Sequence, residues 1–278
     1  MAKFWQLRHK EIGSGALALA RCGRCKGTGV CRQIVAQFDE TGEVVEVERR
    51  LACDCQERAL EMLGRAGLPE GRFGTAALGD LDWPAIQPAK TRVTLQLYIE
   101  RLEEMLAQGM GLTLTGRVGT GKTHVAVGLV RLACGMGIEA RFVSVPELLS
   151  QLRATYGSER GSGEWRGSEG SESEILEELG RVPLLAMDDL GAVKASDWVR
   201  DRLYTLVNRR YVAGRPVVAT MNEGLEALGR RLGQRITSRL GGASLEVCFE
   251  GEDYRRKARD GVLEGMGMGW AELWGRVG

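Results

Sequence analysis

Short apolar runs alternate with amphipathic stretches along the second two thirds of the chain. The helix-like stretches at 91–108, 124–132 and 146–152 carry apolar side chains at helical spacing, and the last of them opens with Pro146. The apolar runs have the length of buried strands, and they occupy residues 112–115, 140–145, 183–189, 216–222 and 245–249. This alternation predicts an α/β fold.

The N-terminal part of the chain follows another pattern. Residues 34–38 and 44–48 are expected to be two strands joined by a polar turn, and residues 56–64 to be a short helix. The stretch that follows is interrupted by prolines and shows no sustained period, which is typical of a connector. The expected domains are therefore an N-terminal domain at 1–65, a linker at 66–90, a core at 91–257 and a tail at 258–278.

Two further stretches fit neither pattern. Residues 157–174 are rich in Gly, Ser and Glu, which predicts a surface insertion. Its single aromatic residue, Trp165, is either incidental or a contact for a nucleic-acid base or a partner. The tail carries Trp270 and Trp274 among glycines, and both a docking helix and a frayed end stay open for it.

One motif points directly to a nucleotide. Residues 116–123 read Gly-Arg-Val-Gly-Thr-Gly-Lys-Thr and match the P-loop pattern at every fixed position, between an expected strand and an expected helix. In such a loop backbone N–H groups surround phosphate oxygens, Lys122 reaches the β and γ phosphates, and the Thr123 hydroxyl ligates Mg²⁺. The residues expected to contact ATP are Gly116, Val118, Gly119, Thr120, Gly121, Lys122, Thr123 and His124.

Two later strand ends carry polar side chains that suit the same chemistry. Asp188 ends one apolar run and is expected beside Thr123, where it holds Mg²⁺, while the adjacent Asp189 orients or deprotonates the attacking water. Asn222 ends the next run. In P-loop ATPases with the strand order 5-1-4-3-2 that position points at the γ-phosphate, so Asn222 is a candidate sensor.

Composition and charge add little beyond this. The 278 residues are 44% apolar and 27% charged, with a net charge of +1, so any nucleic-acid contact must come from a local patch. No run of about 18 apolar residues occurs, and no membrane contact is expected. The basic start and short apolar run of residues 1–20 resemble a signal peptide, a reading that we reject because the P-loop implies a cytoplasmic ATP supply.

Five of the seven cysteines lie within the first 55 residues. The pairs Cys22/Cys25 and Cys53/Cys55 have spacings that suit tetrahedral Zn²⁺, and the expected hairpin between them would bring the pairs together. We therefore predict a small zinc-ribbon-like domain with these four ligands. Cys31 is read as a spare thiol, although it could replace one member of the second pair, and disulfides are disfavoured in a reducing compartment.

These motifs together resemble a known family. The sequences around 116–124, 184–198, 208–211, 220–222 and 235–240 look like the bacterial and phage replicative-helicase loaders of the DnaC type, over about residues 65–257. The resemblance implies an AAA+ P-loop αβα core with a parallel five-stranded sheet, related to the initiator DnaA. It further implies binding of ATP and of single-stranded DNA, and loading of a hexameric replicative helicase. The Asp188-Asp189 ending replaces the Asp-Glu usual in AAA+ proteins, and the shorter second acid predicts slow ATP hydrolysis.

The same resemblance assigns a role to Arg239, at the end of an arginine-rich stretch. It matches the position of the arginine finger in initiator-type ATPases, which reaches the γ-phosphate of the neighbouring subunit and therefore requires an AAA+ oligomer or helical assembly. Only about 30 residues follow the last expected strand, too few for a C-terminal lid domain. In some loaders a zinc-binding N-terminal domain similar to the cysteine-rich segment here engages the helicase.

Two alternatives stay open. An IstB-type transposition helper shares nearly the same ATPase core and acts on DNA with a transposase, although its N-terminus is usually without metal. A zinc-dependent adaptor protein whose ATP site mainly sets its oligomeric state is the other. Turnover separates the adaptor from both ATPases, because an adaptor should bind ATP without DNA-stimulated hydrolysis.

Overall fold

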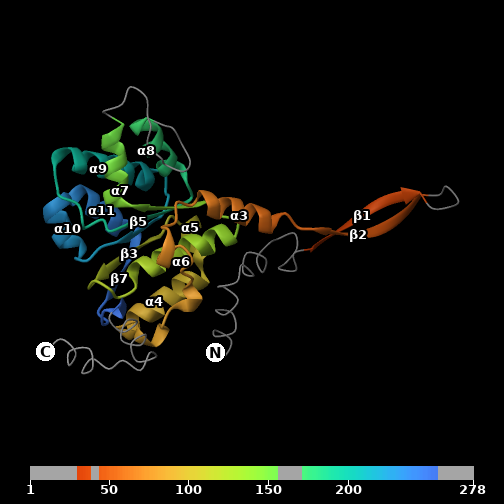
Figure 1. Cartoon of the computed structure of the whole chain (residues 1–278), viewed down its shortest axis with the longest axis horizontal. Coiled ribbons are helices and arrows are strands. Elements are labelled where there is room, and N and C mark those ends of the chain that lie inside the picture. The colour runs from red at the N-terminus through yellow and green to blue at the C-terminus, as the bar shows by residue number, and fades with distance from the viewer. Residues whose placement is uncertain (1–29, 39–43, 156–170, 256–278) are drawn as a thin grey trace, which may run out of the picture.

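A five-stranded parallel sheet forms the centre of the molecule, and an antiparallel hairpin projects away from it (Figure 1). The computed structural model describes residues 30–38, 44–155 and 171–255. The strands lie in the order β4-β5-β6-β3-β7, with the bounds β3 Gly111–Gly116, β4 Ala140–Ser144, β5 Leu184–Asp188, β6 Val217–Thr220 and β7 Ser244–Phe249. Counted within the sheet this is the expected 5-1-4-3-2 order, and the predicted α/β fold with a parallel five-stranded sheet is confirmed.

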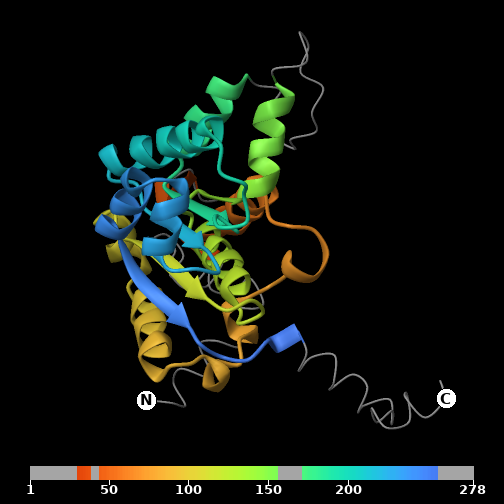
Figure 2. The same ribbon diagram turned by 90° about the vertical axis from the view of Figure 1, so that its left-hand side faces the viewer.

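Helices cover both faces of the sheet (Figures 1 and 2). Successive residues of β5 show the alternation, because Leu184 and Ala186 join one apolar core whereas Leu185 and Met187 join the other. The first core is covered by α3 Cys55–Arg65, α4 Ala89–Glu100, α5 Leu102–Ala107 and α6 Lys122–Gly135. The second is covered by α7 Val145–Ala154, α8 Glu172–Arg181, α9 Asp197–Val212, α10 Leu225–Leu232 and α11 Gln234–Gly242.

The stretch that we expected as a linker, residues 66–90, packs into the first core. It contains three short 3-10 turns, η1 Gly71–Phe73, η2 Leu78–Asp80 and η3 Trp83–Ala85. Ala66 and Leu78 are fully buried there, and the Ala66 carbonyl accepts a 2.7 Å hydrogen bond from the Phe142 amide at the outer edge of β4. Its apolar residues follow no regular period, so the sequence pattern alone gave no sign of their burial.

Two element boundaries differ from expectation. The helix predicted over 91–108 is divided into α4 and α5 at Arg101. The arginine-rich stretch 229–242 forms the end of α10 and all of α11, which are separated at Gly233, where φ is 105°. Helix α8 begins inside the predicted insertion, because Ser171 and Glu174 form a capping box. The prediction of a loop to residue 174 was therefore wrong for its last residues. Trp165 lies outside the described residues.

The predicted N-terminal hairpin is present. Strands β1 Val30–Phe38 and β2 Val44–Ala52 pair antiparallel, with Val30 opposite Ala52 at the base and Phe38 opposite Val44 at the tip. Cys22, Cys25 and the tail with Trp270 and Trp274 lie outside the described residues. In the part of the chain that is described, no helix is long and apolar enough to cross a bilayer.

Candidate nucleotide-binding site

The P-loop connects β3 to α6 at the carboxyl edge of the sheet. Gly119 and Gly121 have φ values of 81° and 99°, a backbone conformation that residues with a side chain rarely adopt. The Lys122 ammonium donates hydrogen bonds to the carbonyl oxygens of Gly116 at 2.8 Å and Arg117 at 2.6 Å. Burial lowers the pKa of Lys122, and the charges of Asp189 and Asp188 oppose that shift. Loop, ammonium and helix N-terminus together form a site for an anion.

Asp188 lies beside the P-loop, as predicted. One of its carboxylate oxygens accepts hydrogen bonds from the Thr123 hydroxyl at 3.0 Å and from the Thr220 hydroxyl at 2.5 Å. Burial raises the pKa of Asp188, while the hydrogen bonds from Thr220 and Thr123 oppose that shift. A hydroxyl and a carboxylate in contact, both with hard oxygen atoms, fit a Mg²⁺ ion, which Thr123 and Asp188 would hold directly or through water.

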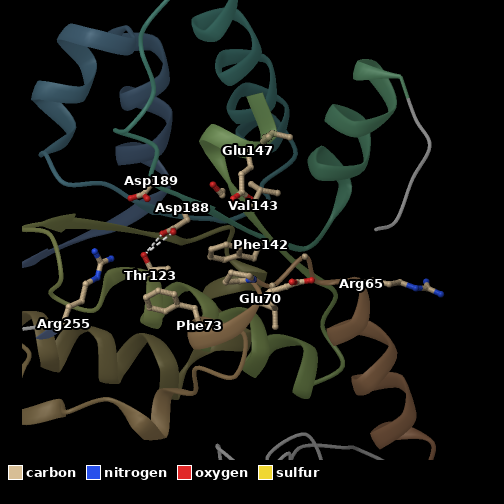
Figure 3. Close-up of a pocket in the computed structure, with 15 residues that line it drawn as sticks. Arg65, Glu70, Phe73, Thr123, Phe142, Val143, Glu147, Asp188, Asp189 and Arg255 are labelled. Atoms are coloured by element: carbon tan, nitrogen blue, oxygen red, sulfur yellow. Dashed lines mark hydrogen bonds between the residues drawn. The ribbon is translucent and has the colours of Figure 1, made fainter. Parts of the chain in front are cut away.

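Asp189 has an unusual backbone conformation. Its φ is 54°, the one positive value among the described residues other than glycine. Such a conformation is costly for a residue with a side chain and is found mostly where the surrounding structure enforces it. Here the Asp189 amide donates to the Thr220 hydroxyl at 3.0 Å, and its carbonyl accepts from the Ala192 amide at 2.9 Å. The strained turn places Asp189 at the cavity beside Asp188 (Figure 3).

A cavity of about 1060 Å³ opens in front of these acids (Figure 3). Thr123, Asp188 and Asp189 form one side of it, and Phe73 and Glu70 from the connector form another. A pocket of about 390 Å³ extends along the P-loop and shares Phe73, Thr123, Asp189 and Arg255 with this cavity. Its other lining residues are Val118, Gly119, Gly121, Lys122, His124, Asn222 and Tyr254. Six of the eight residues predicted to contact ATP therefore line one pocket together with the candidate sensor, and Gly116 and Thr120 do not line it.

Another pocket, of about 430 Å³, borders the start of α6. It is lined by Thr120, Gly121 and His124 on one side, and by parts of the connector and the segment after β7 on the others. The His124 ring is within 2.7 Å of the Ala77 carbonyl, so this side chain also fixes the connector against the helix. The pocket gives a nucleotide base room beside the phosphate site.

Arg239 lies away from these cavities, on the face shared by α11 and α9. Its guanidinium donates to the Asn208 side chain at 2.7 Å and to the Tyr204 hydroxyl at 3.1 Å, and it stacks over the Tyr204 ring. Arg239 lines none of the pockets described above, all of which border the P-loop. Within one chain the predicted finger is therefore not brought to the predicted phosphate site.

Sequence reasoning missed two contributors to the site. Thr220 contacts both Asp188 and the Asp189 amide, and its signal was available, because it is a polar residue at the end of an apolar run, two positions before Asn222. Arg255 borders the cavity and the P-loop pocket, where its positive charge adds to the lowering of the Lys122 pKa that burial mainly causes. Its approach depends on the path of the chain after β7, for which no sequence pattern existed.

The four predicted zinc ligands are only partly described. Cys53 is buried and Cys55 is half-buried at the base of the hairpin, while their expected partners lie outside the described residues. Across residues 30–38, 44–155 and 171–255, no group of three or more His, Cys, Asp or Glu side chains could hold a metal ion. The zinc site stays a prediction.

Comparison with known proteins places the chain among ATP-binding proteins. The family described as IstB-like ATP binding protein matches residues 47–261. The replicative helicase loader DnaC of Escherichia coli strain K12 is 27% identical over 161 residues, which cover 58% of this chain and 61% of DnaC. The putative ATP-binding protein of insertion sequence IS1162 from Pseudomonas fluorescens is 29% identical over 173 residues, which cover 62% of this chain and 67% of that protein.

A solved structure supports the fold. The crystal structure of DnaI superposes with a TM-score of 0.50 at 23% identity, over 69% of this chain and 92% of DnaI. The chain spans about three fifths of the length of the DnaC relative. These relatives are named for two different tasks, helicase loading and insertion-sequence function, so their names do not choose between them.

Proposed function

The chain belongs to the family of IstB-like ATP binding proteins, and we propose that it is a cytoplasmic ATPase that loads a hexameric replicative helicase onto single-stranded DNA. The observation that carries the ATPase part is the contact of Thr123 and Thr220 with Asp188, directly beside the P-loop ammonium. This contact supports the proposal of a Mg²⁺-binding pair, with Asp189 as a second acid at the same cavity and Lys122 as the phosphate-binding cation in the adjoining pocket. That combination is what phosphoryl transfer to water requires.

Each side chain has a distinct part in this proposal. Lys122 would leave the loop carbonyls and pair with the β and γ phosphates. Thr123 and Asp188 would hold Mg²⁺, whose charge would offset the negative charge of the phosphates. Asp189 orients or deprotonates the attacking water, and Asn222 contacts the γ-phosphate. Arg239 of a neighbouring copy completes the site, because within one chain it lies on another face.

The projecting hairpin supports the helicase-loading part. A two-stranded hairpin is only marginally stable in water by itself, so a staple at its base would give it the rigidity that a docking module needs. Val30 and Ala52 pair at that base, and Cys53 and Cys55 follow directly. Zn²⁺ held by Cys22, Cys25, Cys53 and Cys55 would supply the staple, and the helicase would bind this domain.

The zinc proposal predicts one Zn²⁺ per chain. Cys53→Ser should lose the metal, because three ligands hold Zn²⁺ much more weakly than four, and should loosen the N-terminal domain alone. Elemental analysis of the full chain purified without chelator measures the metal content. The matched control is Cys31→Ser in β1, which should keep the metal. Metal-free wild-type protein, or equal metal loss in both variants, would contradict the ligand assignment.

The proposed binding to single-stranded DNA is tested by measuring how the full chain binds fluorescent oligonucleotides. Binding to single-stranded DNA should require ATP, because the DNA-binding surface is assembled from several subunits. It should weaken steeply as salt rises, because phosphate contacts release counterions. Binding to single-stranded DNA that depends on neither ATP nor salt would reject the proposed DNA-binding function.

The transposition-helper function is the second candidate. The family description and the insertion-sequence relative favour it. A helper should prefer duplex DNA and bind a transposase, whereas a loader should prefer single strands and bind a helicase. An adaptor protein would bind ATP without any DNA-stimulated hydrolysis.

A further inference from the structure

We propose that Arg231 is a positioning residue for ATP hydrolysis, which clamps the loop after Asp189 to the residue after Asn222. The inference rests on the proposed ATPase function. Arg231 is in the last turn of α10, and its side chain is about one-third exposed. It lines none of the pockets around the P-loop, so any effect on hydrolysis must pass through other residues.

The guanidinium of Arg231 joins two loops that border the site. One of its terminal nitrogens donates to the Val193 carbonyl at 3.0 Å, and the other donates to the Gly191 carbonyl and to the Glu223 carboxylate. Gly191 and Val193 belong to the loop that begins at Asp189. Glu223 directly follows Asn222. A planar fork with fixed donor directions can hold two carbonyls and a carboxylate at once, which a lysine ammonium cannot match.

The clamp begins where the sheet ends. Thr220 ties the two strands together, since its hydroxyl and carbonyl accept hydrogen bonds from the amides of Asp189 and Leu190, both at 3.0 Å. Beyond Thr220 the strand pairing stops, and Arg231 supplies the next link between the same two chain segments. The packing there is tight. A β-carbon at Gly191 would lie 3.3 Å from the Glu223 carboxylate and 3.4 Å from the Arg231 guanidinium.

This arrangement has a kinetic consequence. The Lys122 ammonium and the P-loop do not touch Arg231, so ATP binding should not depend on it. The positions of Asp189 and Asn222 should depend on Arg231, because both residues adjoin segments that Arg231 holds. A displacement of about 1 Å at a reacting group can lower a rate by about 10²-fold.

The test compares two adjacent arginines of α10 in the full chain. Arg231→Met removes every donor and keeps the apolar stem, and Arg230→Met is the matched control, since Arg230 forms an exposed pair with Glu226 at 2.6 Å. We expect Arg231→Met to lower kcat by about 10- to 100-fold with the affinity for ATP retained, and Arg230→Met to change neither. Arg231→Lys, which can keep the Glu223 contact, should recover part of the rate.

Amide hydrogen exchange separates this inference from the ATPase proposal. In Arg231→Met the amides of Asp189, Leu190 and Ala192 should exchange faster than in the wild type and in Arg230→Met, whether or not any hydrolysis is measured. A wild-type chain that binds ATP without hydrolysing it would reject the ATPase proposal, and the exchange rates would still decide the clamp. Unchanged exchange would overturn the positioning role. If the wild type hydrolyses ATP, an Arg231→Met rate equal to that of Arg230→Met would overturn it as well. A loss of ATP affinity in Arg231→Met that parallels its loss of rate would also overturn the positioning role.

Discussion

Lys122→Ala should lose most of the affinity for ATP, whereas Asp189→Asn should bind ATP and fail to hydrolyse it. The ammonium of Lys122 is held at the loop that receives the phosphates. Hydrogen bonds to a charged group contribute about 1.5–3 kcal/mol, so its removal should weaken binding by about 10- to 100-fold. The role proposed for Asp189 is on the attacking water instead, and a general base contributes about 10²- to 10⁴-fold to the rate.

Two measurements on the same proteins test this division. Titration with a fluorescent ATP analogue gives the affinity, and single-turnover release of phosphate gives the rate of hydrolysis. Lys90→Ala is a suitable control because Lys90 is an exposed lysine of α4, outside the P-loop. Equal loss of affinity in Lys122→Ala and Asp189→Asn would show that Asp189 has a structural role instead.

Arg239→Ala should bind ATP normally and lose hydrolysis, because we propose that the Arg239 guanidinium acts on the site of a neighbouring subunit. An arginine finger raises the rate of phosphoryl transfer by about 10³-fold or more. The structure keeps Arg239 on the α9–α11 face, in contact with Asn208 and Tyr204. Arg235→Ala is the control on the same helix, since Arg235 is exposed one turn earlier.

An experiment in which two inactive variants are mixed shows whether Arg239 acts on the site of a neighbouring subunit or on the site of its own chain. The Arg239→Ala subunit has an intact ATP site, and the Asp189→Asn subunit has an intact arginine finger. In a random equal mixture about one interface in four pairs the two and should hydrolyse ATP. Recovered activity in the mixture is the expected result. No recovery in a mixture shown to assemble together would contradict the assignment, and so would equal inactivity of Arg235→Ala.

Local sequence patterns predicted much of this site. The P-loop fixed the positions of Lys122 and Thr123, and the apolar run ending in Asp188 predicted the strand beside them. Both follow from short-range rules, since a strand of alternating burial and a glycine-rich turn are encoded by neighbouring residues. The order of the strands followed from the motif, because P-loop ATPases of this type share it.

The remaining features depend on contacts between distant segments. The positive φ of Asp189 is enforced by Thr220, some thirty positions later in the chain. Arg255 reaches the cavity only because β7 ends beside the P-loop. The start of α8 is a different case. Ser171 and Glu174 have the spacing of a capping box, which predicts the start of a helix. The polar composition around them led us to predict a loop instead.

The central claim is that this ATPase places a ring-shaped helicase on single-stranded DNA. The most direct measurement is the amount of replicative helicase from the same cell retained on closed circular single-stranded DNA, onto which an intact ring cannot thread. The account predicts retention that requires the full chain and ATP, and that fails with Lys122→Ala. Helicase retention that is the same with and without the chain would contradict the claim, and capture of a transposase on duplex DNA would favour the helper function.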